Sequence, residues 1–149
     1  MLRMAMVLCA VSGAFGQTFM FSVGSPVASQ DFQFKSAAFV FRTTGCTEPA
    51  RPEVSATAEG LVNGARRSVA LRVIPAASKP GVYAVFQSWP ADGQWVVNLK
   101  GVCGSAMAGA VIPVGQKGFI REASKFFARP ATDAEIATSL REFPKGEIK

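Results

Sequence analysis

A segment in the middle of the chain, residues 81–101, constrains the fold most. Its sequence, GVYAVFQSWPADGQWVVNLKG, has two runs rich in β-branched and aromatic residues on either side of Pro90-Ala91-Asp92-Gly93. Such a pattern is typical of two strands joined by a tight turn, here a hairpin with strands over 82–87 and 94–100. Side chains alternate along a strand, so one face of the second strand should point to a core and the other away. The core-facing set is Trp95, Val97 and Leu99, and the outward set is Val96, Asn98 and Lys100.

A second hairpin is predicted over residues 53–74. Residues 53–62 and 66–74 each alternate in polarity, and Asn63-Gly64 separates them. Asn-Gly is the strongest short hairpin signal, because both turn residues must adopt positive φ.

Two further strands complete the expected fold. Residues 32–42 are rich in phenylalanine, with a change of phase near Ser36 that indicates either a bulge or a strand buried on both faces. Residues 106–114 predict another strand, in which Pro113 favours a sheet edge or a strand end. The fold class is therefore all-β: an immunoglobulin-like antiparallel β-sandwich of about 6–8 strands with a short C-terminal α-helix.

Composition narrows the classes of function. The chain has 149 residues, a formal net charge of +6 and no histidine. The length suits one domain, and the lack of histidine excludes Ser-His-Asp and Cys-His catalysis as well as His-ligated metals. Acids are interspersed among the bases, and no basic run is longer than Arg66-Arg67. We therefore expect a solvated surface and no nucleic-acid partner, with an anionic partner such as lipid headgroups, polysaccharide or DNA as the alternative.

The first 29 residues are interpreted as a signal peptide. A short basic start precedes an apolar run over 4–23, Gly24-Ser25-Pro26 breaks this run, and Val27-Ala28-Ser29 offers small residues at a cleavage site. Cleavage after Ser29 is preferred, and cleavage after Ala14-Phe15-Gly16 is the second choice. An uncleaved membrane anchor of about 20 residues is a further alternative. In each case residues 31–149 are expected to be exported, either to the periplasm or out of the cell.

Export determines how the cysteines are interpreted. Cys9 lies in the leader, so the mature chain keeps Cys46 and Cys103. Two cysteines in an oxidising compartment predict a disulfide. A redox pair is disfavoured because the two residues lack C-x-x-C spacing.

The chain changes character after Gly118. We divide the mature protein into a sandwich domain over 30–118 and a C-terminal extension over 119–149, with a helix over about 133–142. Thr132-Asp133-Ala134-Glu135 forms a capping box. The helix is expected to dock on its own sandwich, and contact with a partner or a membrane is the alternative.

One short segment is a candidate contact surface. Phe126 and Phe127 are adjacent and lie between Lys125 and Arg129. Neighbouring side chains on a strand point to opposite faces, so one aromatic ring should be exposed. The four residues are therefore a possible partner contact, with packing between core and loop as the alternative.

The sequence carries no recognisable catalytic constellation. It lacks phosphate-binding, dinucleotide-binding and G-x-S-x-G motifs, and Ser105 in the stretch GSAMAG has no histidine to activate it. Among the acidic residues, Glu53 and Glu59 share a predicted strand but would lie about 20 Å apart. We expect no enzyme, cofactor or metal, although a site built from loop carboxylates or lysine stays open.

The motif Pro80-Gly81-Val82-Tyr83, followed by WPADGQWVV from Trp89, resembles exported immunoglobulin-like domains of the YtkA/FixH type. Copper-resistance sandwiches of the CopC type are more distantly similar. The resemblance covers the central part of the chain and implies two adjacent core strands. It implies no copper binding, because the histidine and methionine ligands of the CopC type have no counterpart here.

These observations predict an exported, non-enzymatic β-sandwich that serves as a binding or accessory module of the cell envelope, with another envelope protein as its partner. The alternative is a carbohydrate- or polyanion-binding module. This alternative is suggested by the excess of basic over acidic residues and by Trp89 and Tyr83, whose rings would offer stacking surfaces.

Overall fold

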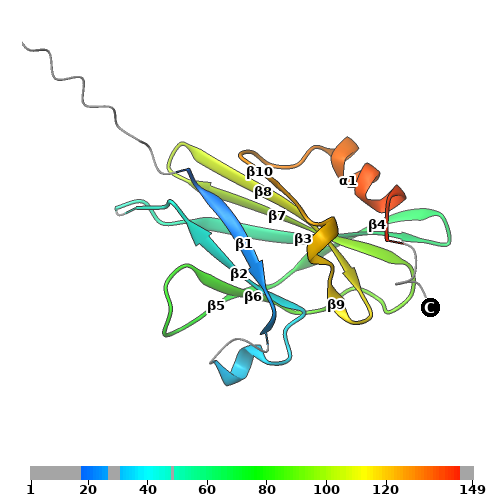
Figure 1. Ribbon diagram of the computed structural model, residues 1–149, viewed down its shortest axis with the longest axis horizontal. Helices are drawn as coiled ribbons and strands as arrows, with labels where there is room; N and C mark the ends of the chain where they lie inside the picture. Colours follow the sequence, from blue (N-terminus) through cyan, green and yellow to red (C-terminus); the bar gives the residue numbers. More distant parts are fainter. Residues whose placement is uncertain (1–17, 27–30, 48, 145–149) are drawn as a thin grey trace, which may run out of the picture.

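Two antiparallel sheets pack face to face in the computed structural model, which describes residues 18–26, 31–47 and 49–144 (Figure 1). The strands are β1 Met20–Gly24, β2 Phe39–Thr44, β3 Glu53–Val62, β4 Ala65–Leu71, β5 Val73–Pro75, β6 Val82–Val85, β7 Gln94–Cys103, β8 Ala106–Gly115, β9 Gly118–Phe119 and β10 Lys125–Phe127. The helices are α1 Asp133–Arg141 and two short 3-10 turns, η2 Phe32–Phe34 and η3 Arg121–Ala123. Sheet A has the order β1-β2-β6-β5, and sheet B has the order β10-β8-β7-β3-β4 with β9 paired to β8. The predicted all-β sandwich with a short C-terminal helix is confirmed.

The hairpin predicted over 53–74 is confirmed as β3 and β4 as far as Leu71. Val73 and Ile74 were predicted to continue its second strand, but they belong to β5 and pair with β6 in sheet A. The turn of the hairpin places Asn63 at φ 51° and Gly64 at φ 76°, and Val62 pairs with Ala65 on either side. Two consecutive positive φ values match the right-handed twist of the paired strands, which is why Asn-Gly sets the register here.

The hairpin predicted over 81–101 is wrong in its pairing, although both strands exist. β6 pairs with β2 and β5 in sheet A, whereas β7 pairs with β3 and β8 in sheet B. Residues 86–93 therefore cross from one sheet to the other. At the end of the crossing, Trp95 Nε1 donates a hydrogen bond of 2.7 Å to the carbonyl oxygen of Asp92.

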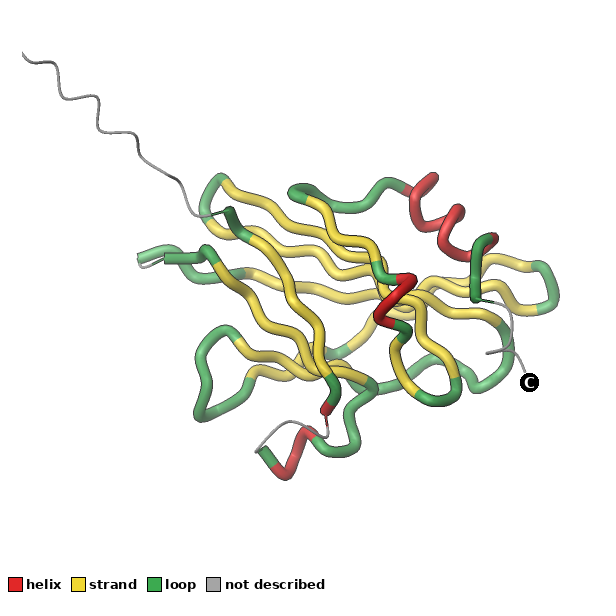
Figure 2. The backbone as a smooth tube through the Cα atoms, in the orientation of Figure 1, coloured by secondary structure: helices red, strands yellow, loops and turns green. Residues whose placement is uncertain are grey.

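The predicted inner and outer faces of β7 are confirmed, but residues of its outer face are buried as well. Trp95, Val97 and Leu99 belong to the core cluster between the sheets. Val96 and Asn98 point to the opposite face as predicted, yet both are buried. They are buried because α1 covers that face of sheet B (Figure 2).

Helix α1 begins with the predicted capping box. The Thr132 side chain accepts from the Glu135 N–H, and the Glu135 carboxylate accepts from the Thr132 N–H at 2.8 Å. These bonds satisfy two backbone donors that the helix itself leaves open. Ile136, Leu140 and Phe143 then form a buried cluster with two side chains of sheet B, Val96 of β7 and Val111 of β8. The helix thus docks on its own sandwich.

The strand predicted over 106–114 is β8, but it is not an edge strand. β7 pairs along one side of β8, while β10 and β9 pair with successive stretches of its other side. Pro113 lies between the β10 and β9 pairings, where its carbonyl oxygen accepts from the Ile120 N–H at 2.8 Å. A residue without an N–H is tolerated there because the ladder is interrupted.

The strand predicted over 32–42 forms only from Phe39 onward. The earlier residues make η2, which Asp31 caps by accepting a hydrogen bond from the Gln33 N–H. η2 places Phe34 on the outer face of sheet A against Val82 and Ala84. The phase change near Ser36 therefore marks a turn and not a bulge.

Elements of the sandwich lie on both sides of each predicted domain boundary. β1 lies inside the segment 1–29 interpreted as a signal peptide, yet it pairs with β2 along its whole length, and Phe19, Phe21 and Val23 belong to the core. In the predicted extension 119–149, β10 completes sheet B and α1 covers it, and residues 145–149 lie outside the described residues. Residues 1–17 and 27–30, which include both proposed cleavage sites, lie outside the described residues.

Candidate functional site

The predicted contact residues belong to β10 and the loop that leads from it to α1. Phe127 pairs with Gly109 and Phe126 with Ala110 of β8. Paired residues share a face. Ala110 belongs to the core between the sheets, so Phe126 projects on the side of sheet A, whereas Phe127 lies in the cluster under α1. The prediction that the two rings point to opposite faces is confirmed.

The two basic residues of this set bind α1. Lys125 Nζ lies 3.3 Å from a carboxylate oxygen of Glu142. Arg129 makes two hydrogen bonds of 2.7 and 2.9 Å to the Glu135 carboxylate, and its guanidinium lies 5.1 Å from the Phe127 ring centroid. Lys125, Phe127 and Arg129 therefore fasten the helix to β10, and only Phe126 is left as a candidate contact.

The bidentate pair perturbs both of its ionisable groups. The hydrogen bond from Arg129, followed by that from the Thr132 backbone, lowers the pKa of Glu135 to about 2. The same side-chain hydrogen bond raises the pKa of Arg129. The pair therefore remains charged through the physiological pH range, which is what a permanent fastening requires.

Phe126 is half-exposed at the edge of sheet B, with 48% of its surface accessible. β10 contacts β1, which is the edge strand of sheet A. The two outermost strands on this side of the sandwich therefore lie together (Figure 1). Met20, on the outer face of β1, is 51% exposed. We call this surface the β1/β10 edge and define it by Met20, Ser22 and Phe126.

The β1/β10 edge differs from the opposite side of the molecule in how its strands are protected. Edge strands in soluble proteins usually carry charge or proline, which prevents pairing with other chains. β4 carries Arg66 and Arg67, and β5 is three residues long and ends in Pro75. β1, with the sequence MFSVG, has neither charge nor proline.

Sequence reasoning missed β1 because its residues continue the apolar run that was interpreted as a signal peptide. A sequence signal for a strand was nevertheless present. Phe19, Phe21 and Val23 alternate with Met20, Ser22 and Gly24, which is the period of a half-buried strand. Phe32, placed in a strand by its sequence, is instead 81% exposed on η2, with Lys35 Nζ 5.3 Å from its ring centroid.

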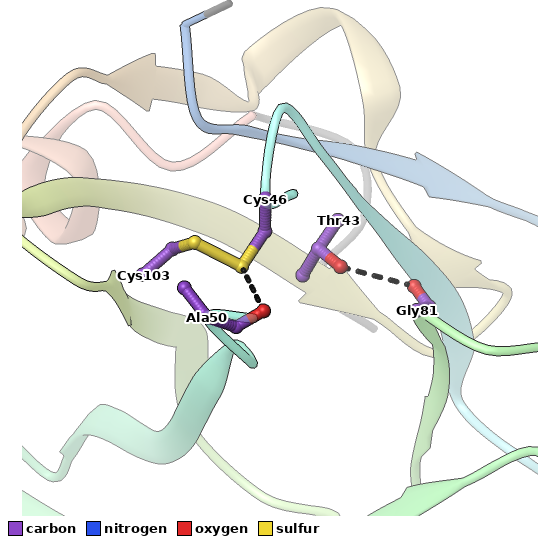
Figure 3. Close-up of a disulfide and its surroundings, with 5 residues drawn as sticks. All are labelled: Thr43, Cys46, Ala50, Gly81 and Cys103. Atoms are coloured by element: carbon purple, nitrogen blue, oxygen red, sulfur yellow. Dashed lines mark hydrogen bonds between the residues drawn. A yellow bond between two sulfur atoms is a disulfide. The ribbon is translucent and has the colours of Figure 1, made fainter. Parts of the chain in front are cut away.

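The predicted disulfide between Cys46 and Cys103 is confirmed (Figure 3). The two Cα atoms lie 5.7 Å apart, and the bond joins the loop after β2 in sheet A to the end of β7 in sheet B. Nearby, the Thr43 hydroxyl donates a 3.4 Å hydrogen bond to the carbonyl oxygen of Gly81. The covalent link thus clamps the two sheets together at one end.

The two aromatic residues proposed as stacking surfaces are occupied within the fold. Trp89 is 8% exposed and belongs to the core cluster. Tyr83 stacks on Phe41 with ring centroids 5.1 Å apart, and burial raises the pKa of its hydroxyl. Phe41 therefore occupies one face of the Tyr83 ring, and Trp89 is enclosed in the core.

A basic hollow lies on the outer face of sheet A. It measures about 240 Å³, and its lining includes Ser22 of β1, Arg42 of β2 and Lys79 in the loop before β6. Arg42 pairs across the ladder with Ser22 on one side and with Val82 on the other. Arg42 and Lys79 both line this hollow, and their positive charges favour an anion there.

Four carboxylates form ion pairs that join elements of the fold. Glu59 and Asp133 both bind Arg66, and Glu142 and Glu135 bind β10 and the loop after it. Over the described ranges, no group of three or more His, Cys, Asp or Glu residues could hold a metal ion. Within the same ranges, no helix is long and apolar enough to cross a bilayer.

Fold and site together define a disulfide-clamped antiparallel β-sandwich with one unprotected lateral edge. No protein-family model, curated protein or solved structure matches the chain. The likeness of the central segment to YtkA/FixH domains therefore remains a prediction from sequence.

Proposed function

We propose that this protein is an exported, non-enzymatic β-sandwich that binds another protein of the cell envelope by accepting one of its strands along β1. The single observation that carries the proposal is an edge strand without charge or proline beside the half-exposed ring of Phe126. The disulfide supports export, because such bonds persist in oxidising compartments.

Strand addition would use both backbone and side chains of the β1/β10 edge. Main-chain groups on the open side of β1 would supply hydrogen bonds, and the side chains of the added strand would fall alternately on its two faces. Met20 offers an apolar contact on the outer face, and Phe126 offers one on the inner side. An apolar, alternating segment of an envelope protein is the partner that fits this edge.

The non-enzymatic part of the proposal rests on how the acids are used. The four carboxylates held in ion pairs stabilise the contacts of β3, β4, β10 and α1. Their partners are arginine and lysine. Glu59 and Asp133 meet at the guanidinium of Arg66, which is paired with both carboxylates, so their convergence serves an ion pair and not an acid and base pair.

Site-specific crosslinking tests the proposal. A photoreactive phenylalanine analogue at position 126, in protein expressed in its own envelope, should yield a discrete protein adduct. The same analogue at Met107, which is 47% exposed on the outer face of β8, is the matched control and should yield none. Equal crosslinking from both positions, or none from 126, would overturn the proposal.

A second experiment places a charge on the β1/β10 edge. Ser22→Lys should abolish the adduct, because lysine on an edge strand blocks pairing. Ala70→Lys, which places the same charge on the exposed face of β4, should leave the adduct intact. Both variants should melt within a few degrees of the wild type, since both positions are exposed.

The basic hollow favours a second candidate function, the binding of an anionic polysaccharide or another polyanion by Arg42 and Lys79. Retention on immobilised heparin should fall in Arg42→Ser and stay unchanged in Arg67→Ser on β4. Ser22→Lys separates the two functions, because it adds a cation to the hollow while it blocks the edge. It should strengthen heparin retention and remove the protein adduct.

A further inference from the structure

We propose that the β1/β10 edge accepts one extended strand with no second sheet behind it, and that this strand carries apolar side chains on its inner face and a carboxylate on its outer face. The inference rests on the proposed function and names the chemistry of the partner segment.

The two sheets are offset on this side of the sandwich. A Cβ on Gly101 of β7 would lie 2.5 Å from Phe21 Cζ and 3.0 Å from Phe19 Cε1, so the inner side chains of β1 reach β7. Two strands of sheet B, β8 and β10, lie outside β7, and β1 contacts both of them. Sheet B therefore extends further on this side than sheet A does.

Phe126 and its partner Ala110 show where sheet A ends. The two residues pair and share the inner face, yet Ala110 is fully buried whereas 48% of Phe126 is exposed. Sheet A therefore covers β8 and stops short of covering β10. A strand paired to the open side of β1 would continue sheet A over β10, and an apolar side chain on its inner face would cover the Phe126 ring.

This offset limits the partner to a single strand. Neighbouring strands lie about 4.8 Å apart, and packed sheets lie about 10 Å apart. The edge strand of a folded sandwich has its own second sheet at that depth, and this second sheet would need the place that β10 occupies. A segment with both faces free, such as an extended linker, meets no such obstacle.

The outer surface beside β1 is positively charged. Gly24 of β1 lines the basic hollow together with Arg42 and Lys79. A Cβ on Gly24 would meet nothing within 4 Å, so the surface is clear between the open side of β1 and the hollow. Among the described residues, no carboxylate forms an ion pair with Arg42 or Lys79.

A carboxylate on the added strand would pair with these cations. The added strand would lie about 10 Å from β2, which is within the combined reach of an arginine and a glutamate side chain. An outward glutamate beside Gly24 would therefore reach the hollow and gain charge-assisted hydrogen bonds. Because side chains alternate along a strand, the partner segment should alternate apolar residues with polar ones and carry an acid at one polar position.

Synthetic peptides test this chemistry. The probe is a fluorescent heptapeptide of alternating valine and threonine with glutamate at its central threonine position, and its anisotropy should rise when it binds the full chain with the disulfide formed. A peptide with glutamine at that position should bind about tenfold more weakly, because the charge-assisted pair is lost. A peptide of the same composition with its valines grouped together should not bind, since it cannot present them on one face.

Substitutions in the protein locate the two contacts. Arg42→Ser combined with Lys79→Ser should lower the affinity for the glutamate peptide to that for the glutamine peptide and leave the latter unchanged. Arg67→Ser, at an exposed position of β4, is the control and should change neither affinity. Phe126→Ser should weaken the binding of both peptides.

Sedimentation of the protein alone tests the limit to a single strand. The wild type should form no dimer that Ser22→Lys dissolves and Ala70→Lys preserves. Such a dimer would show that a folded sandwich can pair with β1, and it would overturn the inference.

The peptide results separate this inference from the proposed function. Equal binding of the glutamate and glutamine peptides, or no binding of any peptide, would overturn the inference. Equal binding of the grouped and alternating peptides would also overturn it and would favour recognition of a polyanion by charge alone. The proposed function would stand in each case if position 126 still gave its adduct in the envelope. The expected peptide preferences without that adduct would support the inferred chemistry and remove the proposed function.

Discussion

Replacing Phe21 by alanine should destabilise the protein strongly, although this residue lies within the segment whose sequence resembles a leader. Phe21 is 5% exposed and packs edge to face on Phe19 and Phe41. Its ring tip approaches Gly101, which has no side chain to move into the space that the ring would leave. The cavity would therefore persist instead of collapsing.

The size of the effect follows from this geometry. Truncation of a buried phenylalanine costs about 3–5 kcal/mol, and the cost is higher where neighbours cannot relax. We expect a loss of about 4 kcal/mol in the free energy of unfolding. For a domain of this size, that loss lowers the melting temperature by roughly 15 °C.

Urea unfolding followed by tryptophan fluorescence measures this loss, because Trp89 and Trp95 both lie in the core. The variant should unfold at a lower urea concentration with an unchanged slope. Ser22→Ala, an exposed neighbour on the same strand, should change the stability by less than about 0.5 kcal/mol. If Phe21→Ala unfolded at the wild-type urea concentration, β1 would not be part of the mature fold, and the reasoning from its burial would fail.

Three further changes test other parts of the structure. Replacing Cys46 and Cys103 together by serine should cost about 4 kcal/mol, because the bond closes a loop with a sequence separation of 57, and thermal unfolding of the double variant should not respond to reductant. Gly101→Ala should cost about 1–3 kcal/mol through overpacking against Phe21 and lose most of that cost in a Phe21→Ala background; additive effects in this cycle would contradict the contact. Glu135→Gln should lower the melting temperature above pH 5, because the depressed pKa of Glu135 contributes stability above its unfolded value. The difference should vanish as the pH falls toward 2, and a constant difference would argue against the pair.

Features of this fold that depend on neighbours in sequence could be predicted. The β3–β4 turn depends on Asn63-Gly64, and the start of α1 depends on Thr132 and Glu135 within one helical turn. In both cases the residues that form the structure are adjacent, so the pattern alone contains the physical cause. The alternation of Trp95, Val97 and Leu99 also identified the inner face of β7 correctly.

Features that depend on distant contacts could not be predicted. Strands β6 and β7 look like a hairpin because a turn within one sheet and a crossing between two sheets use the same residues. Only the pairing of β6 with β2 and of β7 with β3 distinguishes them. The alternation of β7 places Val96 on the outer face, and only the distant contact with α1 shows that this residue is buried.

The candidate site shows the same limit. The adjacency of Phe126 and Phe127 was enough to predict that they face opposite sides of a strand. Their environment was not predictable, because Lys125 and Arg129 are bound by acids of a helix that follows later in the chain. The open edge of β1 also depends on long-range pairing, and it was not predicted because its sequence continues the apolar run interpreted as a signal peptide.

The contact between β1 and Gly101 has a consequence for the order of events during biogenesis. β1 is the first of the described strands in the chain, yet the glycine against which Phe19 and Phe21 pack is in β7, two residues before Cys103 of the disulfide. The sandwich cannot close until β7 has emerged, and contacts so distant in sequence make closure slow. During that interval the apolar inner face of β1 stays uncovered, so the newly made chain should depend on a chaperone more than its small size suggests.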